Sequence, residues 1–459
     1  MPAARPAAAP GSVPSGAVPN NEFANPWSFA RAGQSRALRS TASVIANGAL
    51  LALLGCGVLI AVAAAAGESF LVATPPERFP AWIAGPLSGL GSTMGRPEFL
   101  TLVLFMWVAY AIVIAACSRV RPVLAISVVV ALHAVFLLAP PLLSTDIFSY
   151  LDYARLGAVH GLNPYIHTPF AARQDPVYDL VGPKWDHTAT AYGPLFTLLS
   201  YPLAHLSVPN AVWALKGIAT LGSLGCVGLV WRGARLLGRD PLRPALLVGL
   251  NPLLLVYAVA GGHNDLLMMA LMVGAVVLAL GSERAAGAAL VAAATVKASA
   301  VVVLPFMLAG LGRPRRVLAG AAVAVGVAAL VSGLVFDWQA WRFLDVVRHQ
   351  QQLVGSQSFS LQVGRLFGLE QADVTAIAQV ALALTAVALL VAVRRGADWV
   401  AASGWMLLAI AVATSFLLPW YTVWALPLAA ISADRRLLAA TLFIEVLFFV
   451  HQLGPLLMA

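Results

Sequence analysis

Long apolar stretches alternate with short polar ones along almost the whole chain, and this alternation indicates helices that cross a membrane. A transmembrane helix needs roughly 20 predominantly apolar residues. Stretches of suitable length occupy residues 41–66, 99–118, 121–141, 209–231, 243–260, 263–282, 316–336, 373–393, 399–417 and 437–457. Two further stretches have unusual lengths, namely 285–311, which Lys297 interrupts, and 419–432.

Basic residues between the apolar stretches predict the topology, because cytoplasmic loops are enriched in Lys and Arg. The clusters are Arg31/Arg36/Arg39, Arg119/Arg121, Arg232/Arg235/Arg239/Arg243, Arg284, Arg313/Arg315/Arg316, Arg394/Arg395 and Arg435/Arg436. All can face the cytoplasm if 285–311 forms a hairpin of two short helices turning near Lys297, if 419–432 returns through the membrane, and if 193–208 does not cross. We therefore predict an all-α polytopic integral membrane protein with about 13 transmembrane helices and a cytoplasmic N-terminus.

Composition supports this class. Only 10% of the residues are charged and 60% are hydrophobic, whereas soluble domains carry about 25% charged residues. The net charge of +9 does not indicate nucleic acid, because the basic residues lie in the turns. Residues 1–39 are rich in Ala, Pro, Ser and Gly and predict a disordered cytoplasmic tail. Residues 40–459 then form the membrane domain, with outer segments 67–98, 142–208 and 337–372.

Asp146 is the first candidate for catalysis. Ser144 or Thr145 can cap a helix that runs to about His160 and ends at Gly161. Partial loss of water at the membrane edge would raise the pKa of Asp146 and suit it to act as a general base. A carboxylate that only complements the helix dipole is the alternative.

Asp152 and Lys297 are two further charged residues with distinct interpretations. Asp152 lies three residues before Arg155, which predicts a surface ion pair. Lys297 is the lone charge of its apolar stretch, which makes it a functional candidate, although its ammonium could instead reach the interface.

The sequence Gly261-Gly262-His263-Asn264-Asp265 joins two predicted spans. His263 is a candidate to contact a phosphate, and Asp265 to orient a sugar hydroxyl or to hold His263 as a cation. The alternative is that Asn264 and Asp265 only cap the next helix.

Aromatic and amide side chains of the outer segments suit a carbohydrate ligand. Tyr192 and the run Pro419-Trp420-Tyr421 offer aromatic faces for sugar rings, but an aromatic belt at the membrane interface explains them equally. Gln350, Gln351, Gln352 and Gln357 offer hydrogen bonds to hydroxyls, and a solvated loop is the preferred interpretation of these glutamines.

The motifs together resemble those of the polyprenol-phosphate-mannose-dependent α-1,6-mannosyltransferases of actinomycete cell envelopes, within the GT-C glycosyltransferases. They are Thr145-Asp146-Ile147-Phe148-Ser149-Tyr150, His160-Gly161-Leu162-Asn163-Pro164-Tyr165, Tyr192-Gly193-Pro194, Gly262-His263-Asn264-Asp265 and Leu418-Pro419-Trp420-Tyr421. Asp146 matches the essential acidic position of that family. Two features depart from the expected pattern. Phe148 stands where we expect Tyr in many relatives, and three spans precede the acidic loop, where many members of the GT-C superfamily have one.

The resemblance implies a GT-C-like fold and a reaction at the outer face of the bacterial cytoplasmic membrane. Mannose would pass from polyprenyl-phosphate-mannose to an α-1,6-mannan or lipoglycan acceptor with inversion, because the donor is β-linked and the product α-linked. Candidates for binding the donor phosphate are His263, Lys297, Arg155 and Lys184. Candidates for binding sugar or acceptor are Tyr150, Asn163, Tyr165, Tyr192, Asn264, Asp265, Gln357, Trp420 and Tyr421.

Three alternatives stay open at this point. The donor sugar could be arabinose or glucose, the acceptor could be a protein, and a transporter of lipid-linked sugars is a third class. No cofactor is required by this scheme. The aspartates of the outer segments lack a spacing that is typical of metal ligands. Whether the protein binds an Mg²⁺ or Mn²⁺ ion is left open at this point.

Overall fold

A computed structural model of the protein describes residues 26–67, 69–73, 80–350, 352–432 and 434–457, and every regular element in these ranges is a helix. The all-α prediction is thereby confirmed. The longer helices are α1 (Pro26–Ala64), α2 (Arg96–Ala115), α3 (Pro122–Leu138), α6 (Val208–Leu236), α8 (Asp265–Ala279), α9 (Glu283–Val296), α11 (Pro314–Phe336), α14 (Gln371–Arg394), α15 (Trp399–Ala413) and α17 (Arg435–Leu457).

Five of the described helices are long and apolar enough to cross a membrane. They are Thr41–Ala64 within α1, then α2, α6, α11 and α14. α14 shows why these helices need lipid, because Val380, Leu384 and Val387 are each at least 60% exposed on its surface and such an apolar face is unstable in water. The chain is therefore a membrane protein. The predicted number of 13 spans is not confirmed, since several of the predicted stretches form shorter helices.

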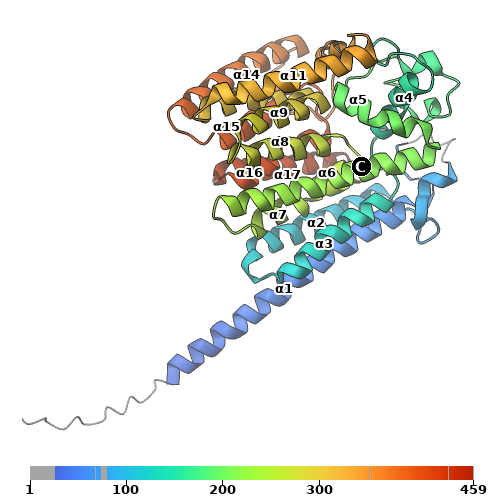
Figure 1. Ribbon diagram of the computed structural model, residues 1–459. Coiled ribbons are helices and arrows are strands. Elements are labelled where there is room, and N and C mark those ends of the chain that lie inside the picture. Colours follow the sequence, from blue (N-terminus) through green and yellow to red (C-terminus); the bar gives the residue numbers. More distant parts are fainter. Residues whose placement is uncertain (1–25, 68, 74–79, 351, 433, 458–459) are drawn as a thin grey trace, which may run out of the picture.

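The helices stack side by side in layers, with α1 to α3 at one edge and α11 and α14 at the other (Figure 1). Close contacts between helices rely on small residues. At Gly287 of α9 and Gly320 of α11, an added Cβ would lie 2.1 Å from the carbonyl oxygen of Val317 and 1.9 Å from that of Arg284, respectively. The two glycines therefore allow the backbones of α9 and α11 to touch, as small residues do between membrane helices.

The stretch 243–260 does not form the single helix that its hydropathy predicts. It divides into α7 (Leu242–Gly249) and the π-helical segment η7 (Leu254–Val259). Pro252 lacks a backbone N–H and interrupts helical hydrogen bonding. The Asn251 amide stabilises the break, because its Oδ1 accepts from the Leu254 N–H and its Nδ2 donates to Glu445 Oε2 at 2.6 Å.

The predicted hairpin over 285–311 is confirmed. α9 ends at Val296, Lys297 has an extended backbone, and the chain returns through η8 (Ala298–Val302) and α10 (Val303–Gly310). The two ends of the hairpin meet where the Arg313 N–H donates to Glu283 Oε1 at 3.1 Å. Lys297 therefore lies at the tip of the hairpin.

The segment 419–432 ends beside a basic turn, as the Arg435/Arg436 cluster that follows it predicts. It starts with η10 (Pro419–Tyr421), continues through α16 (Leu426–Ile431), and ends where Arg239 Nη1 donates to the Ile431 carbonyl at 2.6 Å. Arg239 belongs to the basic turn after α6. In Figure 1 this turn and the one between α2 and α3 lie at the end of the molecule opposite to α4 and α5.

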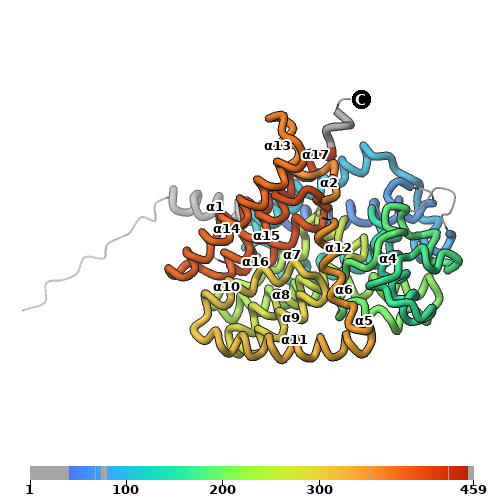
Figure 2. Tube along the Cα trace, turned by 90° about the horizontal axis from the view of Figure 1, so that it is seen from above, coloured from blue at the N-terminus to red at the C-terminus, as the bar shows by residue number. Residues whose placement is uncertain are grey.

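The segment 142–208 folds into short helices that gather at one end of the stack (Figures 1 and 2). They are α4 (Asp146–Ala158), η4 (Pro169–Ala172), η5 (Tyr178–Leu180), α5 (Pro194–Ser200) and η6 (Tyr201–His205). α5 and η6 are too short to cross a membrane, as predicted for 193–208. α4 ends three residues before Gly161, whose φ of +67° makes it the expected site for the chain to turn away.

The segments 67–98 and 337–372 contain further short helices. They are η2 (Ala81–Leu87), η9 (Ala340–Arg342), α12 (Phe343–Gln350) and α13 (Phe359–Leu366), and η3 (Cys117–Arg119) joins α2 to α3. α1 begins at Pro26, so residues 26–39 belong to a helix where the sequence predicts a disordered tail. The rest of that predicted tail, residues 1–25, lies outside the described residues.

Candidate active site

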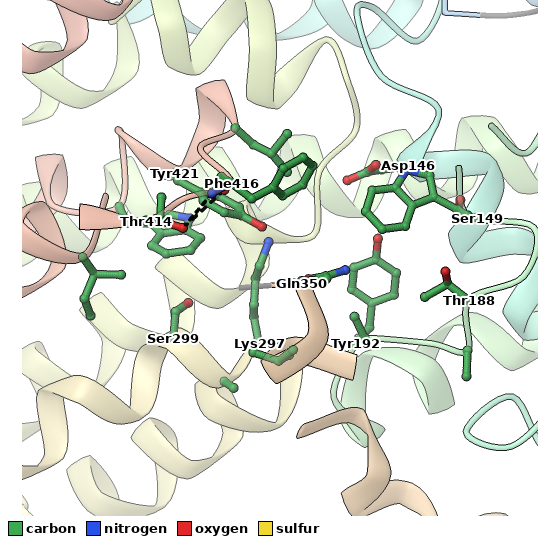
Figure 3. Close-up of a pocket in the computed structure, with 18 of the residues that line it drawn as sticks. Asp146, Ser149, Thr188, Tyr192, Lys297, Ser299, Gln350, Thr414, Phe416 and Tyr421 are labelled. Carbon is green, nitrogen blue, oxygen red and sulfur yellow. Dashed lines mark hydrogen bonds between the residues drawn. The ribbon is translucent and has the colours of Figure 1, made fainter. Parts of the chain in front are cut away.

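A cavity of about 280 Å³ opens among α4, the loop before α5, the tip of the Lys297 hairpin, α12 and η10. Figure 3 shows the polar side chains around it, with Asp146, Ser149 and Thr188 gathered on one side of Lys297. Its polar and aromatic lining residues are Asp146, Ser149, Tyr153, Trp185, Thr188, Tyr192, Lys297, Ser299, Gln350, Thr414, Phe416, Tyr421 and Trp424. Aromatic and hydroxyl groups around one carboxylate and one ammonium suit a sugar that carries a negative charge.

Asp146 opens α4 at the edge of this cavity. Its N–H donates to Ser144 Oγ at 3.1 Å. The N-cap residue is Thr145, whose side chain makes no capping hydrogen bond, so the predicted side-chain cap is not formed. Its side chain is 18% exposed, and one carboxylate oxygen lies 3.4 Å from Nδ1 of His263. Burial by itself raises the pKa of the Asp146 carboxyl, but His263, the ammonium of Lys297 and Ser144 together hold this pKa below its ordinary value. The predicted upward shift is therefore wrong, because the contacts with His263, Lys297 and Ser144 together outweigh desolvation of the Asp146 carboxyl.

His263 lies behind Asp146 and is fully buried. Its ring stacks on Trp420, with centroids 3.5 Å apart and planes at 25°. The imidazole does not line the cavity, so the prediction that His263 contacts a phosphate is replaced by a contact with the carboxylate of Asp146. Trp420 likewise supports His263 and presents no face to the cavity.

Lys297 projects into the cavity from the hairpin tip. Its Nζ donates to both carboxylate oxygens of Asp265, at 2.7 and 2.9 Å, and lies 4.9 Å from the ring centroid of Tyr421. Trp424 Nε1 also donates to Asp265, at 2.7 Å. Asp265 is fully buried and holds Lys297, whereas the sequence suggested a sugar hydroxyl or His263 as its partner. Two of the three ammonium donors are used, and one remains for a ligand.

Tyr192 lines the cavity as predicted, and Gly193 explains why. The Gly193 N–H donates to the Val296 carbonyl at 3.1 Å, and a Cβ on Gly193 would lie 2.2 Å from the Thr295 carbonyl oxygen. Only glycine allows the loop to approach the end of α9 so closely. This contact brings Tyr192 beside Lys297.

Two predicted phosphate ligands lie outside the cavity. Arg155 Nε is 2.9 Å from both carboxylate oxygens of Asp175, and its Nη1 donates to the Ala204 carbonyl. Lys184 lies over the ring of Phe416 at 4.0 Å, beside the cavity rim. The predicted surface pair of Asp152 with Arg155 is wrong, because Arg155 pairs with Asp175 while Asp152 is buried and its Oδ2 has no hydrogen-bond partner. Burial, followed by the charge of Asp175, raises the pKa of Asp152 to about 7.

The other predicted sugar-binding residues have structural contacts. Tyr150 Oη donates to Asn264 Oδ1 at 3.3 Å, and both residues are buried. Asn163 donates to the Phe336 carbonyl at 2.7 Å, and Tyr165 Oη donates to the Tyr192 carbonyl at 3.1 Å.

These four side chains, together with Gln357, do not line the cavity. Tyr421 does line it, as the sequence predicts.

The sequence did not predict several of the residues that line the cavity. Ser149 follows Asp146 by three residues, so the two residues share one helix face. This spacing is enough to predict that Ser149 lies beside Asp146. Gln350 was interpreted as part of a solvated loop, and Trp185 and Thr188 carry no local pattern that distinguishes them. Within the described ranges, no group of three or more His, Cys, Asp and Glu side chains could hold a metal ion.

Comparison with known proteins identifies the family of the chain. A family model described as "Alpha-(1->6)-mannopyranosyltransferase, N-terminal domain" matches residues 52–313, more than half of the chain. The chain belongs to this family. A second model, "MptB C-terminal domain", matches residues 354–454. The resemblance drawn from the sequence motifs is thereby confirmed.

Individual relatives carry the same name. Alpha-(1->6)-mannopyranosyltransferase A of Mycobacterium tuberculosis is 29% identical over 340 residues, which are 67% of this chain and 65% of that protein. A probable alpha-(1->6)-mannopyranosyltransferase of Mycolicibacterium smegmatis is 37% identical over 149 residues, 31% of this chain and 26% of the relative. The Corynebacterium glutamicum alpha-(1->6)-mannopyranosyltransferase A is 29% identical over 174 residues, 37% and 35% of the two chains. The matches thus span less than two thirds of these relatives, and no solved structure matches the chain.

Proposed function

We propose that this protein is a mannosyltransferase that moves mannose from a polyprenyl-phosphate-mannose to an α-1,6-mannan or lipoglycan acceptor, with inversion at the anomeric carbon. One observation carries the proposal: Asp146 and Lys297 line the same cavity of a membrane protein. The names of the relatives support mannose and the α-1,6 linkage.

Asp146 would act as the general base. Because its pKa is held below the ordinary value, its carboxylate is ionised at neutral pH and can accept the proton of the acceptor hydroxyl. The hydroxyl oxygen forms a bond to the anomeric carbon, and the bond from that carbon to the phosphate oxygen breaks. The electron pair leaves with the lipid phosphate, which becomes a monoester dianion.

Lys297 would stabilise that growing negative charge. A leaving phosphate is a stable anion and needs no general acid, so a fixed ammonium within the cavity supplies the help that the transition state requires. Asp265 and Trp424 fix the position of the ammonium before the donor arrives. His263 contributes through Asp146, whose carboxylate it orients.

The depth of the site supports a lipid-linked donor. Arg284 of α9 meets Gly320 of α11, and from that contact α9 continues to Val296 and α11 to Phe336, which is four residues further. At about 1.5 Å per residue the tip at Lys297 lies roughly 6 Å short of the far end of α11. A donor whose phosphate sits at the membrane surface can reach such a recessed ammonium with its lipid still among the helices.

We further propose that the site faces the outside of the bacterial cytoplasmic membrane. Basic turns gather at the end of the molecule away from α4 and α5 (Figure 1), and such turns prefer the cytoplasm. Donor and acceptor would then meet at the outer face, where envelope glycans are built.

The test is a transfer assay with purified protein, synthetic polyprenyl-phosphate-mannose and a short α-1,6-mannoside. Wild-type protein should form an α-linked product, and Asp146→Asn should lower the rate by about 10²- to 10⁴-fold while keeping donor binding. Full activity of a folded Asp146→Asn protein would remove the base assignment. Parallel donors carrying arabinose or glucose test the sugar, and assays with Mg²⁺, Mn²⁺ or EDTA test whether a divalent ion takes part.

A further inference from the structure

The cavity has two chemically different ends, and each holds a serine hydroxyl without a partner. Ser149 and Ser299 both line the cavity, and the Oγ atom of each is buried with no hydrogen-bond partner among the described residues. Figure 3 shows them on opposite sides of Lys297, Ser149 beside Thr188 and Ser299 below Thr414. Buried hydroxyls are normally hydrogen-bonded, so both positions suit the polar groups of a bound ligand.

Ser149 belongs to the end that holds the base. It lies one helical turn after Asp146 on the same face of α4 and is only 3% exposed. Thr188 and Tyr192 line the cavity on the same side of Lys297 (Figure 3). Apart from Asp146, the described residues there are uncharged, which favours a neutral, hydroxyl-rich ligand.

Ser299 belongs to the end that holds the cation. It follows Lys297 by two residues at the start of η8, and Val302 and Ile410 line the cavity near it. An ammonium next to apolar side chains suits a phosphate that carries a hydrocarbon chain. Gln350 of α12 lies between the two ends, between Lys297 and Tyr192 (Figure 3).

We infer that the Ser149 end is the acceptor subsite, which binds the terminal sugar of a neutral mannose oligosaccharide, and that the Ser299 end receives the phosphate and first lipid carbons of the donor. The inference rests on the proposed function and adds the direction in which the two substrates lie. The opposite arrangement would put the phosphate beside the carboxylate of Asp146 and the acceptor hydroxyl beside a cation, away from its base.

The test is direct binding to the purified full-length protein, with α-1,6-mannobiose for the acceptor end and farnesyl phosphate for the donor end. Ser149→Leu fills the acceptor end and should weaken mannobiose binding at least tenfold while leaving farnesyl phosphate within twofold. Ser299→Leu is the matched variant and should do the reverse. Ser149→Ala removes a hydroxyl that has no hydrogen-bond partner in the described part of the chain. It should therefore keep the melting temperature and weaken mannobiose binding about two- to tenfold.

Each result decides the inference. Unchanged mannobiose affinity in Ser149→Leu, the reverse pattern between the two variants, or no binding of mannobiose to the wild-type protein would overturn it. Failure of the proposed function looks different: mannobiose still binds at the Ser149 end, but no mannose is transferred from polyprenyl-phosphate-mannose.

Discussion

The partners of each charged side chain determine where it lies and how its pKa is shifted. Lys297 and Lys184 are both cations near the same cavity, but only Lys297 lines it, because Asp265 and Trp424 hold its side chain there. Lys184 instead lies against the face of Phe416 at the rim. The contacts with His263, Lys297 and Ser144 hold the pKa of Asp146 below its ordinary value, whereas burial raises the pKa of Asp152, whose Oδ2 has no hydrogen-bond partner among the described residues.

The two lysines give a matched pair of variants. Lys297→Met removes the ammonium that would stabilise the leaving phosphate, so kcat/KM for the donor should fall about 100-fold or more. Lys184→Met should change kcat/KM by no more than about twofold, since an exposed cation over a ring contributes little. Transfer rates at varied donor concentration measure both. A larger loss in Lys184→Met than in Lys297→Met would reverse the assignment of the phosphate ligand.

Asp152 should make the stability of the folded protein fall as the pH rises, which is opposite to the effect expected from Asp146. Its pKa is about 7 in the folded protein and about 3.9 in the unfolded chain, so between these values the folded state holds a proton that the unfolded state releases. The stabilisation is complete below about pH 4 and is lost as the pH rises towards 7. We expect the melting temperature of the wild-type protein to fall between pH 5 and 8.

The variant Asp152→Asn isolates this effect, because an amide does not titrate. Its melting temperature should fall less than that of the wild type over pH 5 to 8, and it should be the more stable protein at pH 8. Asp373→Asn, at an exposed position at the start of α14, serves as the control and should follow the wild type. Parallel curves for the wild type and Asp152→Asn would contradict a buried, protonated Asp152.

At the scale of elements, interruptions of helices build the site. The hairpin breaks at Lys297, α8 starts at Asp265 and α4 starts at Asp146, so each key side chain stands where a helix begins or ends. Apolar periodicity predicts helices but not the points at which they break. Polar residues inside apolar stretches indicate those points, as Lys297 does here and as Asn251 does for the stretch 243–260.

The contact between α5 and α9 can be tested through Gly193. In Gly193→Ala the new Cβ meets the Thr295 carbonyl, so the loop must move away from α9 and carry Tyr192 with it. We expect a loss of about 1–3 kcal/mol in stability and at least a tenfold loss of transfer activity. Gly217→Ala is the control, because its Cβ would meet no atom within 4 Å. Transfer activity should stay unchanged, and stability should not fall and should rise by up to about 1 kcal/mol, since Gly217 lies inside α6. Equal behaviour of the two variants would show that the close approach is unimportant.

At the scale of the whole molecule, the candidate active site and the basic turns are at opposite ends. The polar cavity is lined by residues of α4 and of the loop before α5. The turns that carry the basic residues lie at the other end of the helices (Figure 1). The apolar helix faces between them contact lipid. This polarity along the helices is what gives the protein one expected orientation in a membrane.

Cysteine labelling tests that orientation. Arg173 directly follows η4 and Arg395 directly follows α14, and both residues are exposed. The three native cysteines can be replaced first. A membrane-impermeant maleimide should label Arg173→Cys in intact spheroplasts and Arg395→Cys only after lysis. The opposite labelling pattern would place the site in the cytoplasm.

The sequence by itself determined the helical membrane class, the hairpin at Lys297, the helix that starts at Asp146, and the family. These features depend on local properties, namely apolar length, capping residues and contiguous motifs, which are read within a few turns of chain. Only the tertiary structure decided the partners. Asp265 meets Lys297 and Trp424, which are 32 and 159 residues away, and Arg155 meets Asp175 rather than the nearer Asp152. Such pairings depend on how helices pack against one another, and burial then sets which charges stay ionised, so neither follows from spacing along the chain.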